Sequence, residues 1–504
     1  RLLDPRLRGF NDASISGNLN LAAFDLKVNA QVPLFSYDGK TFSNIRLAGN
    51  GNRDTLKADI AADDIQISDS LHFPSTNLKL TANNDVSEIQ LKTSAGKTLN
   101  DAEINASVQT LSDGVKLHFF PSSFIINDKK WLLAKDGELT IRKNYLDANE
   151  VKFVHEDQQI VLSTELDDVT DQTHIVAKLN KVDLEDFAPL VFKKPSVKGL
   201  LTGTANIRDP FGKVIVDFTG KADSFSLDNE YVGNVDLTAS ANTNTGLVKF
   251  KAGVNDSSNV FAIDGSYNYK DSSENQMNVD LLAKRIHLKI LEPYLGTIFS
   301  RMDGFAATNL KLSGGPDHRY ITGQATLQDD TLQIAYTQCT YILKNETITF
   351  EKDAINFGKL TLRDIYNNTG TLSGVMKHRF FQDLDFDNLR LETSKMLLLN
   401  TTKKDNGQFY GKVIGSAVMT IDGPTSNLQM NIDGQPSILD SSHIYLPTGA
   451  GKESNAIDYI EFIQFGSKME QGLSLSQGTN ITVNLNIRAN PACKIDVILD
   501  EETG

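Results

Sequence analysis

Apolar and polar residues alternate near the C-terminal end of the chain, with Ile498 as the one apolar exception. The segment NITVNLNIRANPACKIDVILD (480–500) carries apolar side chains at every second position, namely Ile481, Val483, Leu485, Ile487, Ile495, Val497 and Leu499. A β-strand points successive side chains to opposite faces, so this segment has one apolar face and one polar face. The pattern is typical of a half-buried hairpin, whose apolar face must be covered by another layer.

The same alternation recurs along the whole chain. Examples are FDLKVNAQV (24–32), NLKLTA (77–82), LVKFKA (247–252), KLTLRD (359–364) and GKVIGSAVMTIDG (411–423). Clusters of Asn, Asp, Gly and Ser separate these segments, as turns separate antiparallel strands. The sequence therefore predicts an all-β protein.

Two stretches break the alternation and predict short helices. The first, VDLEDFAPLVF (182–192), begins after a good N-cap residue, Asp183, and has apolar residues at helical spacing. The second, IHLKILEPYLGTIFSRM (286–302), contains Pro293, which is expected to start or kink the helix. Its apolar face would carry Leu291, Leu295, Ile298 and Met302.

The two predicted helices mark an internal repeat. LEDFAP (184–189) and LKILEP (288–293) share the pattern L-x-x-[FL]-x-P, 104 residues apart, and each precedes a glycine and new strands. Repeats that stack on their neighbours form elongated objects. We expect four portions: an N-terminal sheet (1–181), two repeats (182–285 and 286–388), and a C-terminal β-domain (389–504) with a long loop at about 433–478.

Composition narrows the possible partners. The net charge is −14 and the pI about 5.1, which excludes a broad nucleic-acid surface and broad docking on an anionic membrane. The longest notable apolar run, MLLL (396–399), is too short to span a bilayer. The chain starts without Met or a signal peptide, so we expect it to be part of a larger protein whose membrane anchor is missing.

A search for reactive residues finds no catalytic or metal-binding pattern. The eight histidines have no metal-ligand spacing, and Cys339 and Cys493 are too few for a disulfide framework or a zinc site. Asp383, Asp385 and Asp387 imitate the start of a calcium loop, but its later positions do not match. We therefore expect no enzymatic activity, no cofactor and no metal.

The many apolar strand faces need a cover that the few helices cannot supply. The sheet either closes on side chains of its own, or curls into a trough whose apolar floor is covered by acyl chains. The short period of a β-helix is absent, which favours the trough. The predicted fold is thus an elongated, twisted and curled antiparallel or mixed sheet, a half-pipe with a few short helices.

The C-terminal residues resemble a known family. LRLETSKMLLLNTTKKDN (389–406), GQFYGKVIGSAVMTIDGPTSNLQMNIDG (407–434), HIYLPTG (443–449) and the closing strands resemble the TamB group of AsmA-like proteins of the Gram-negative envelope, in its Bacteroidota form. The resemblance implies an inner-membrane anchor, a path through the periplasm and an outer-membrane partner of the Omp85 or TamA type. It also implies a hydrophobic groove that moves phospholipid between the membranes.

From this resemblance and the alternation we expect a groove lining and a gate. The expected lining residues are Phe409, Val413, Met419, Ile421, Ile481, Val483, Leu485, Ile487, Ile495, Val497 and Leu499. The expected gate is the helix face of Leu291, Leu295, Ile298 and Met302. Two alternatives remain: an assembly factor for outer-membrane proteins that works by strand augmentation, and a structural stalk with a protein-filled interior.

Overall fold

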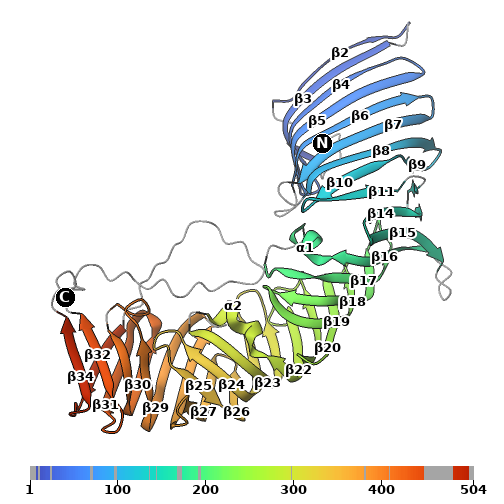
Figure 1. Ribbon diagram of the computed structural model, residues 1–504. Helices are drawn as coiled ribbons and strands as arrows, with labels where there is room; N and C mark the ends of the chain where they lie inside the picture. The colour runs from blue at the N-terminus through green and yellow to red at the C-terminus, as the bar shows by residue number, and fades with distance from the viewer. Residues whose placement is uncertain are drawn as a thin grey trace. The chain divides into compact units, whose positions relative to one another are not determined.

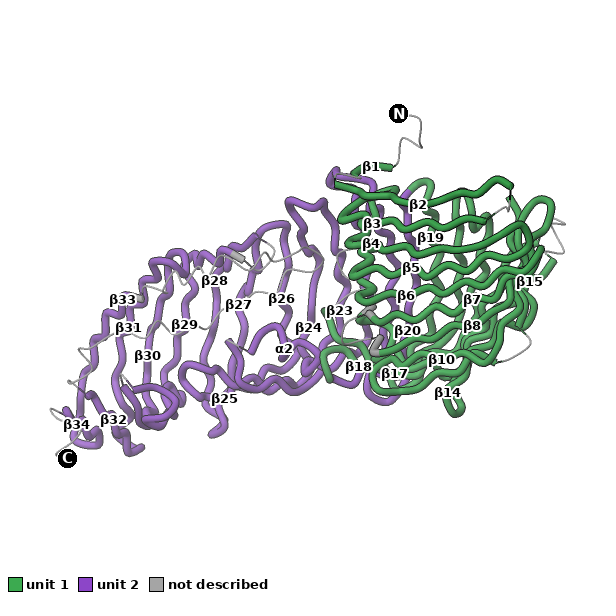
Figure 2. The backbone as a smooth tube through the Cα atoms, turned by 90° about the horizontal axis from the view of Figure 1, so that it is seen from above, with its two compact units in different colours: residues 1–229, 234–245 green, residues 230–233, 246–504 purple. Residues whose placement is uncertain are grey.

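The computed structural model describes residues 7–9, 12–22, 25–67, 72–95, 99–134, 137–143, 145–166, 173–190, 194–296, 298–379, 382–407, 409–447 and 481–498. It is almost entirely β-structure (Figure 1). The chain divides into two compact units, residues 1–229 with 234–245 and residues 230–233 with 246–504 (Figure 2).

Unit 1 contains the first eighteen strands and most of β19. They are β1 (Leu7–Gly9), β2 (Ser14–Asn20), β3 (Asp25–Tyr37), β4 (Lys40–Gly51), β5 (Thr55–Gln66), β6 (His72–Asn83), β7 (Val86–Ala95), β8 (Leu99–Leu111), β9 (Gly114–Phe119), β10 (Ser122–Ile126), β11 (Lys129–Leu133), β12 (Glu138–Arg142), β13 (Tyr145–Asn149), β14 (Val151–His155), β15 (Gln158–Leu166), β16 (Thr173–Asp183), β17 (Val197–Arg208), β18 (Ile215–Leu227) and β19 (Glu230–Asn242). Helix α1 (Leu184–Phe187) and the 3₁₀ turn η1 (Ala188–Leu190) follow β16.

Unit 2 contains the start of β19 and all later strands. They are β20 (Leu247–Asn255), β21 (Val260–Asn268), β22 (Met277–His287), β23 (Phe299–Gly314), β24 (Arg319–Ile334), β25 (Thr340–Leu343), β26 (Glu346–Glu351), β27 (Ala354–Asp364), β28 (Thr369–Arg379), β29 (Gln382–Thr401), β30 (Tyr410–Pro424), β31 (Leu428–Pro436), β32 (Ser442–Pro447), β33 (Ile481–Ile487) and β34 (Cys493–Ile498). The turns η2 (Leu288–Leu291) and η3 (Thr425–Asn427) and helix α2 (Glu292–Leu295) complete it.

Within each unit, strands that follow one another in the chain mostly pair antiparallel. In unit 1, β2 to β8 form an uninterrupted meander, and the sheet then continues as two rows of short strands, β9–β12–β13 and β10–β11–β14. In unit 2 the strands follow one another in a long curled row (Figure 2). The predicted all-β fold, a curled antiparallel and mixed sheet in the form of an open trough, is confirmed.

The last strands correct two predictions. β33 pairs in parallel with β31, and β34 in parallel with β32, so together they form one interrupted strand along the sheet edge rather than the two arms of a hairpin. The alternation fixes which residues share a face but does not fix the pairing partner. The predicted loop at 433–478 is also wrong at its start, because β31 extends to Pro436 and Ser442–Pro447 is β32. Residues 448–480 lie outside the described residues.

The first predicted helix is present and short. Asp183 caps α1, its side chain accepting a hydrogen bond from the Glu185 N–H at 3.1 Å. The chain then tightens into η1, and the predicted helical residue Val191 lies outside the described residues.

The second predicted helix is largely wrong. Leu291 ends η2 and Leu295 ends α2, whereas Ile298 lies in a turn and Met302 lies in β23. Pro293 does sit in the first turn of α2, as predicted. The apolar spacing of residues 298–302 fits a strand as well as a helix, and pairing of β23 with β22 and β24 decides in favour of the strand.

A recurrent glycine device bends the strands. Gly304 in β23 has φ +117° and faces Asp329 in β24, which is in the left-handed region at φ +52°. A Cβ at Gly304 would lie 2.0 Å from Asp330 Oδ1, so only glycine fits there. Gly374 faces Asn388 in the same way. Such bulges increase local twist and curl the sheet.

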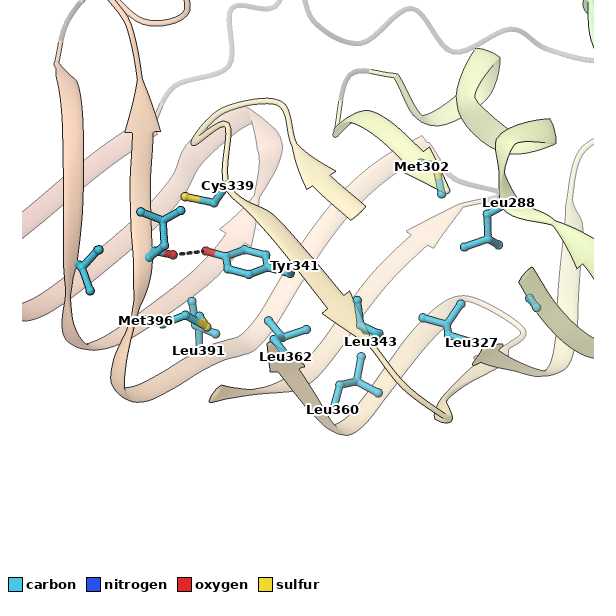
Figure 3. Packing of buried hydrophobic residues seen from close by; sticks show 13 residues of the cluster. Leu288, Met302, Leu327, Cys339, Tyr341, Leu343, Leu360, Leu362, Leu391 and Met396 are labelled. Atoms are coloured by element: carbon cyan, nitrogen blue, oxygen red, sulfur yellow. Dashed lines mark hydrogen bonds between the residues drawn. The ribbon is translucent and has the colours of Figure 1, made fainter. Parts of the chain in front are cut away.

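The main core lies in unit 2, where η2, α2 and the short strand β25 join the long strands in one apolar cluster. Its buried residues are Leu288, Met302, Ala306, Leu327, Cys339, Tyr341, Leu343, Leu360, Leu362, Leu391, Met396, Leu397 and Ile414 (Figure 3). Strand β25 contributes Tyr341, whose hydroxyl donates to the Leu397 carbonyl at 3.0 Å. A smaller core in unit 1 surrounds Ala106, Phe119 and Val151 where the sheet is split.

Candidate apolar binding face

An unbroken row of apolar side chains crosses the first seven-strand meander of unit 1. Because directly opposed residues of paired strands point to the same face, the register fixes this row exactly across β2 to β8. We call it the apolar ladder, and its members are Ile15, Ala30, Leu47, Ile60, Leu78, Leu91 and Ile104. A second apolar row runs beside it through Val28, Gly49, Ala58, Leu80 and Ile89.

The opposite face of the same strands is polar. Its corresponding row is Ser16, Asn29, Ala48, Asp59, Lys79, Gln90 and Asn105. Cross-strand ion pairs such as Lys92–Glu103, 3.4 Å, lie on this polar face. The meander therefore has one polar face suited to solvent, and its other face is apolar and needs an apolar partner to cover it.

Protein does not bury the apolar ladder fully. Ala30, Leu47, Ile60, Leu78, Leu91 and Ile104 are all half-buried, and Ile15 on β2 is 73% exposed. By contrast, Leu360 and Leu391 in the core of unit 2 are only 2% and 7% exposed. The ladder is an apolar surface partly open to a ligand.

Unit 2 carries a comparable row that changes from buried to open. This C-terminal ladder consists of Leu360, Leu372, Leu391, Met419, Ile432 and Leu485. It begins in the main core, becomes half-buried at Met419 and Ile432, and ends with Leu485, 53% exposed, on the edge strand.

The register brings several of the predicted lining residues together. Met419 and Leu485 belong to the C-terminal ladder. Ile421 and Val483 oppose Met430 in the next row, and Ile487 opposes Gly434. Ile495 and Val497 lie on β34, 38% and 54% exposed, opposite Ile444 and Leu446.

The remaining predicted lining residues are placed differently. Val413 is half-buried opposite Leu399. Ile481, the first residue of β33, opposes Leu428 in β31. Phe409 lies in the turn before β30 with its ring 5.8 Å from that of Tyr336. Leu499 lies outside the described residues.

A buried charge cluster fixes α1 to the hairpin β10–β11. Lys129 Nζ lies 2.7 Å from Asp183 Oδ2 and 2.8 Å from Asp186 Oδ2, and Asn127 donates to Asp186 at 2.9 Å. Burial alone would lower the pKa of Lys129, but its hydrogen bonds to both carboxylates raise it. Because the Asp186 side chain is fully buried, its carboxylate needs the Lys129 ammonium group as a counter-charge.

Polar contacts also fix the turn around α2. The buried Asn259 donates to the Val232 carbonyl at 2.7 Å and accepts from the His287 N–H at 2.8 Å. Glu292 Oε1 accepts from the Met302 N–H at 2.8 Å. Leu295 packs against the main core, whereas Leu291 is 42% exposed.

Asp330 is a buried acid that sequence reasoning missed. Its side chain is fully buried next to Gly304, and neither carboxylate oxygen has a hydrogen-bond partner among the described residues. Burial raises the pKa of Asp330 to about 7, and the nearby backbone of Gln328 and Phe305 offsets only part of this effect. Asp330 lies in an alternating strand, so the sequence pattern did not predict its burial. The bulge at Asp329 changes the direction of the Asp330 side chain.

The histidines, cysteines and acidic residues of the described ranges form no metal-binding cluster. Cys339 and Cys493 are both free, and burial raises the pKa of Cys339 to about 11. No helix in the described part of the chain is long and apolar enough to cross a membrane.

Comparison with known proteins gives one match. Residues 358–503 match the family model of the TamB C-terminal domain, from within β27 to beyond β34. No curated protein and no solved structure matches the chain. The matched stretch holds the whole C-terminal ladder and every predicted lining residue. The TamB family consists of non-enzymatic transport and assembly proteins of the Gram-negative envelope. Residues 358–503 therefore resemble the C-terminal domain of TamB proteins, which belong to the Gram-negative cell envelope.

Proposed function

We propose that the chain conducts phospholipid along the apolar face of its sheets, in the periplasm, between an inner-membrane anchor and the outer membrane. The observation that supports this most strongly is the apolar ladder, seven strands wide and nowhere fully buried. The TamB domain is consistent with an envelope role and leaves the cargo open.

The physical basis of transport is desolvation without bond making. Acyl chains laid across the strands gain about 25 cal/mol per Å² of apolar surface removed from water. Since successive rungs such as Leu47, Ile60 and Leu78 are chemically alike, neighbouring positions differ little in free energy and a lipid can move between them. Headgroups remain at the open, hydrated side.

The short helices are candidate control points along this path. α1 and α2 follow β16 and β22, where each is fixed by polar contacts. Of the predicted gate residues, Leu291 is the one left exposed, so we assign any gating at α2 to Leu291 with Leu295 holding the turn in place.

Assembly of outer-membrane proteins is a second candidate function. Among the described strands, β33 and β34 are paired along one side, with β31 and β32. An open strand edge of this kind can accept a strand from another protein. An outer-membrane barrel of the Omp85 type is the partner that we propose for this reading.

Native mass spectrometry of the purified chain tests the lipid conduit. Leu80→Asp places a charge on the apolar face, and its control Thr81→Asp places the same charge on the polar face of the same strand. We expect mixed phospholipids bound at substoichiometric levels in the wild type and the control, and loss of lipid in Leu80→Asp. Wild-type protein free of lipid, with cross-links from β34 to a barrel protein, would favour assembly instead.

A further inference from the structure

A connecting loop at the C-terminal end carries apolar side chains that the lipid conduit does not use. Residues 437–441 connect β31 to β32, and within them Ile438 is 71% and Leu439 85% exposed. Leu439 is the most exposed large hydrophobic side chain of the described residues. Two adjacent aliphatic side chains so far from any protein cover require an explanation.

The loop is held rigidly. The Ser437 hydroxyl donates to Asp440 at 2.6 Å and accepts from the Leu439 N–H at 3.2 Å. Lys395 forms an ion pair with Asp440 at 2.7 Å, and the Ser437 N–H donates to the Ile414 carbonyl at 2.8 Å. The apolar pair is therefore presented in a fixed position, so its exposure does not result from a loose loop.

The strands β30, β32 and β34 beside this loop carry a row of aromatic and basic side chains on one face. Tyr410 and Tyr445 stack at 4.8 Å, and the neighbouring rung is Lys412, His443 and Lys494. Lys412 donates to the Tyr366 hydroxyl at 2.7 Å. Lys494 lines a cavity of about 440 Å³ together with Ile438, Leu439 and Cys493. We call this set, with the loop, the C-terminal patch.

The local charge is opposite to that of the chain. Between 395 and 412 there are four lysines and one aspartate, and Lys494 adds a fifth lysine. The patch also contains Asp440, paired with Lys395 at 2.7 Å, and Asp496, paired with Lys494 at 2.9 Å and with His443 at 2.7 Å. Five lysines against three aspartates leave a small positive excess, although the chain as a whole has a net charge of −14. Lys403 and Lys404 are exposed in the turn between β29 and β30. A membrane contact by this acidic protein must therefore be local, and this is where its charge permits one.

We propose that the C-terminal patch docks on a bilayer surface that contains anionic lipid. Ile438 and Leu439 enter the acyl boundary, the tyrosines lie at headgroup level, and the lysines contact lipid phosphates. Protruding aliphatic residues insert into a bilayer, tyrosine combines an apolar ring with a polar tip, and lysine extends its charge to the interface. Such docking would keep the open end of the apolar face next to a membrane.

Vesicle co-sedimentation of the full chain tests this proposal. The probes are vesicles of phosphatidylethanolamine with a minority of phosphatidylglycerol, and vesicles of phosphatidylcholine alone. The test variant is Ile438→Ser/Leu439→Ser. The control is Leu132→Ser/Leu282→Ser, which removes two exposed leucines, 52% and 59%, from β11 and β22. All four side chains are exposed, so we expect folding to be unaffected, which circular dichroism checks.

We expect wild type and control to bind the anionic vesicles. The test variant should bind them at least about tenfold more weakly. In Leu439→Trp we expect quenching by brominated acyl chains, whereas the buried Trp131 remains unquenched. Equal binding of test variant and control, absence of wild-type binding, or absence of quenching would overturn the proposal. Phospholipid retention in native mass spectrometry, read on the same variants, reports on the conduit separately.

Discussion

The meander β2–β8 of unit 1 and the core of unit 2 are built from the same alternating pattern, but their apolar faces are buried to different degrees. In unit 2, the short elements η2, α2 and β25 contribute side chains to the core, where Met396 and Leu397 are 0% and 1% exposed. In unit 1, no described segment covers the apolar ladder beyond half-burial. An apolar strand face is thus a structural core in one place and an available surface in the other.

This difference shows that alternation alone does not reveal function. What distinguishes the core of unit 2 is that short elements contribute to it: η2 supplies Leu288, and the short strand β25, paired with β24 and β27, supplies Tyr341 and Leu343. The Tyr341 hydroxyl also fixes β25 to β29 through the Leu397 carbonyl. Where such segments are absent, the free energy of covering the apolar face is left for a ligand.

Truncating matched leucines should give the largest effect and test the comparison directly. Leu360→Ala leaves a cavity in a dry core and should lower the free energy of unfolding of unit 2 by about 2–5 kcal/mol. Leu78→Ala removes a half-buried side chain from the apolar ladder and should cost unit 1 about 1 kcal/mol or less. Urea unfolding with hydrogen exchange read in each unit measures both. Equal costs would show that the ladder is an ordinary core.

Asp330 makes the core of unit 2 sensitive to pH. Its pKa is raised from 3.8 to about 7 by burial, so the folded state holds a proton that the unfolded state releases. Stability should fall as pH rises from about 4 to about 7, by up to about 1.4 kcal/mol per pH unit, and level off above. Asp330→Asn should remove this slope. Urea midpoints of wild type and variant that run parallel between pH 5 and 7 would refute the assignment.

A buried and an exposed ion pair, one in each unit, should differ in a smaller but clear way. Lys129→Met leaves Asp186, fully buried, without its cation and should cost about 3 kcal/mol. Lys251→Met breaks a pair with Asp264 whose side chains are 70% and 62% exposed, and should leave the melting temperature almost unchanged. Thermal melts at low and high salt measure the two costs. A large cost at Lys251 would contradict the view that the polar face is merely solvated.

The sequence predicted which side chains share the apolar face of a strand, but not what packs against that face. Period-two alternation placed Met419, Val483 and Leu485 on one face, and register confirmed it, because side-chain direction is a local property. Pairing is not local, so the parallel edge formed by β33 and β34 was predicted wrongly as a hairpin. Met302 was assigned to a helix because its spacing fits both periods. The exposed pair Ile438 and Leu439 gave no signal within a presumed loop.

Site-specific photocrosslinking tests the central claim that lipid covers the apolar ladder. A photoreactive amino acid is placed at Leu78, on the ladder, or at its neighbour Lys79, on the polar face, in cells that carry the full-length protein. We expect phospholipid adducts at position 78 and none at position 79. Adducts to protein alone at position 78, or equal lipid adducts at both positions, would contradict the claim.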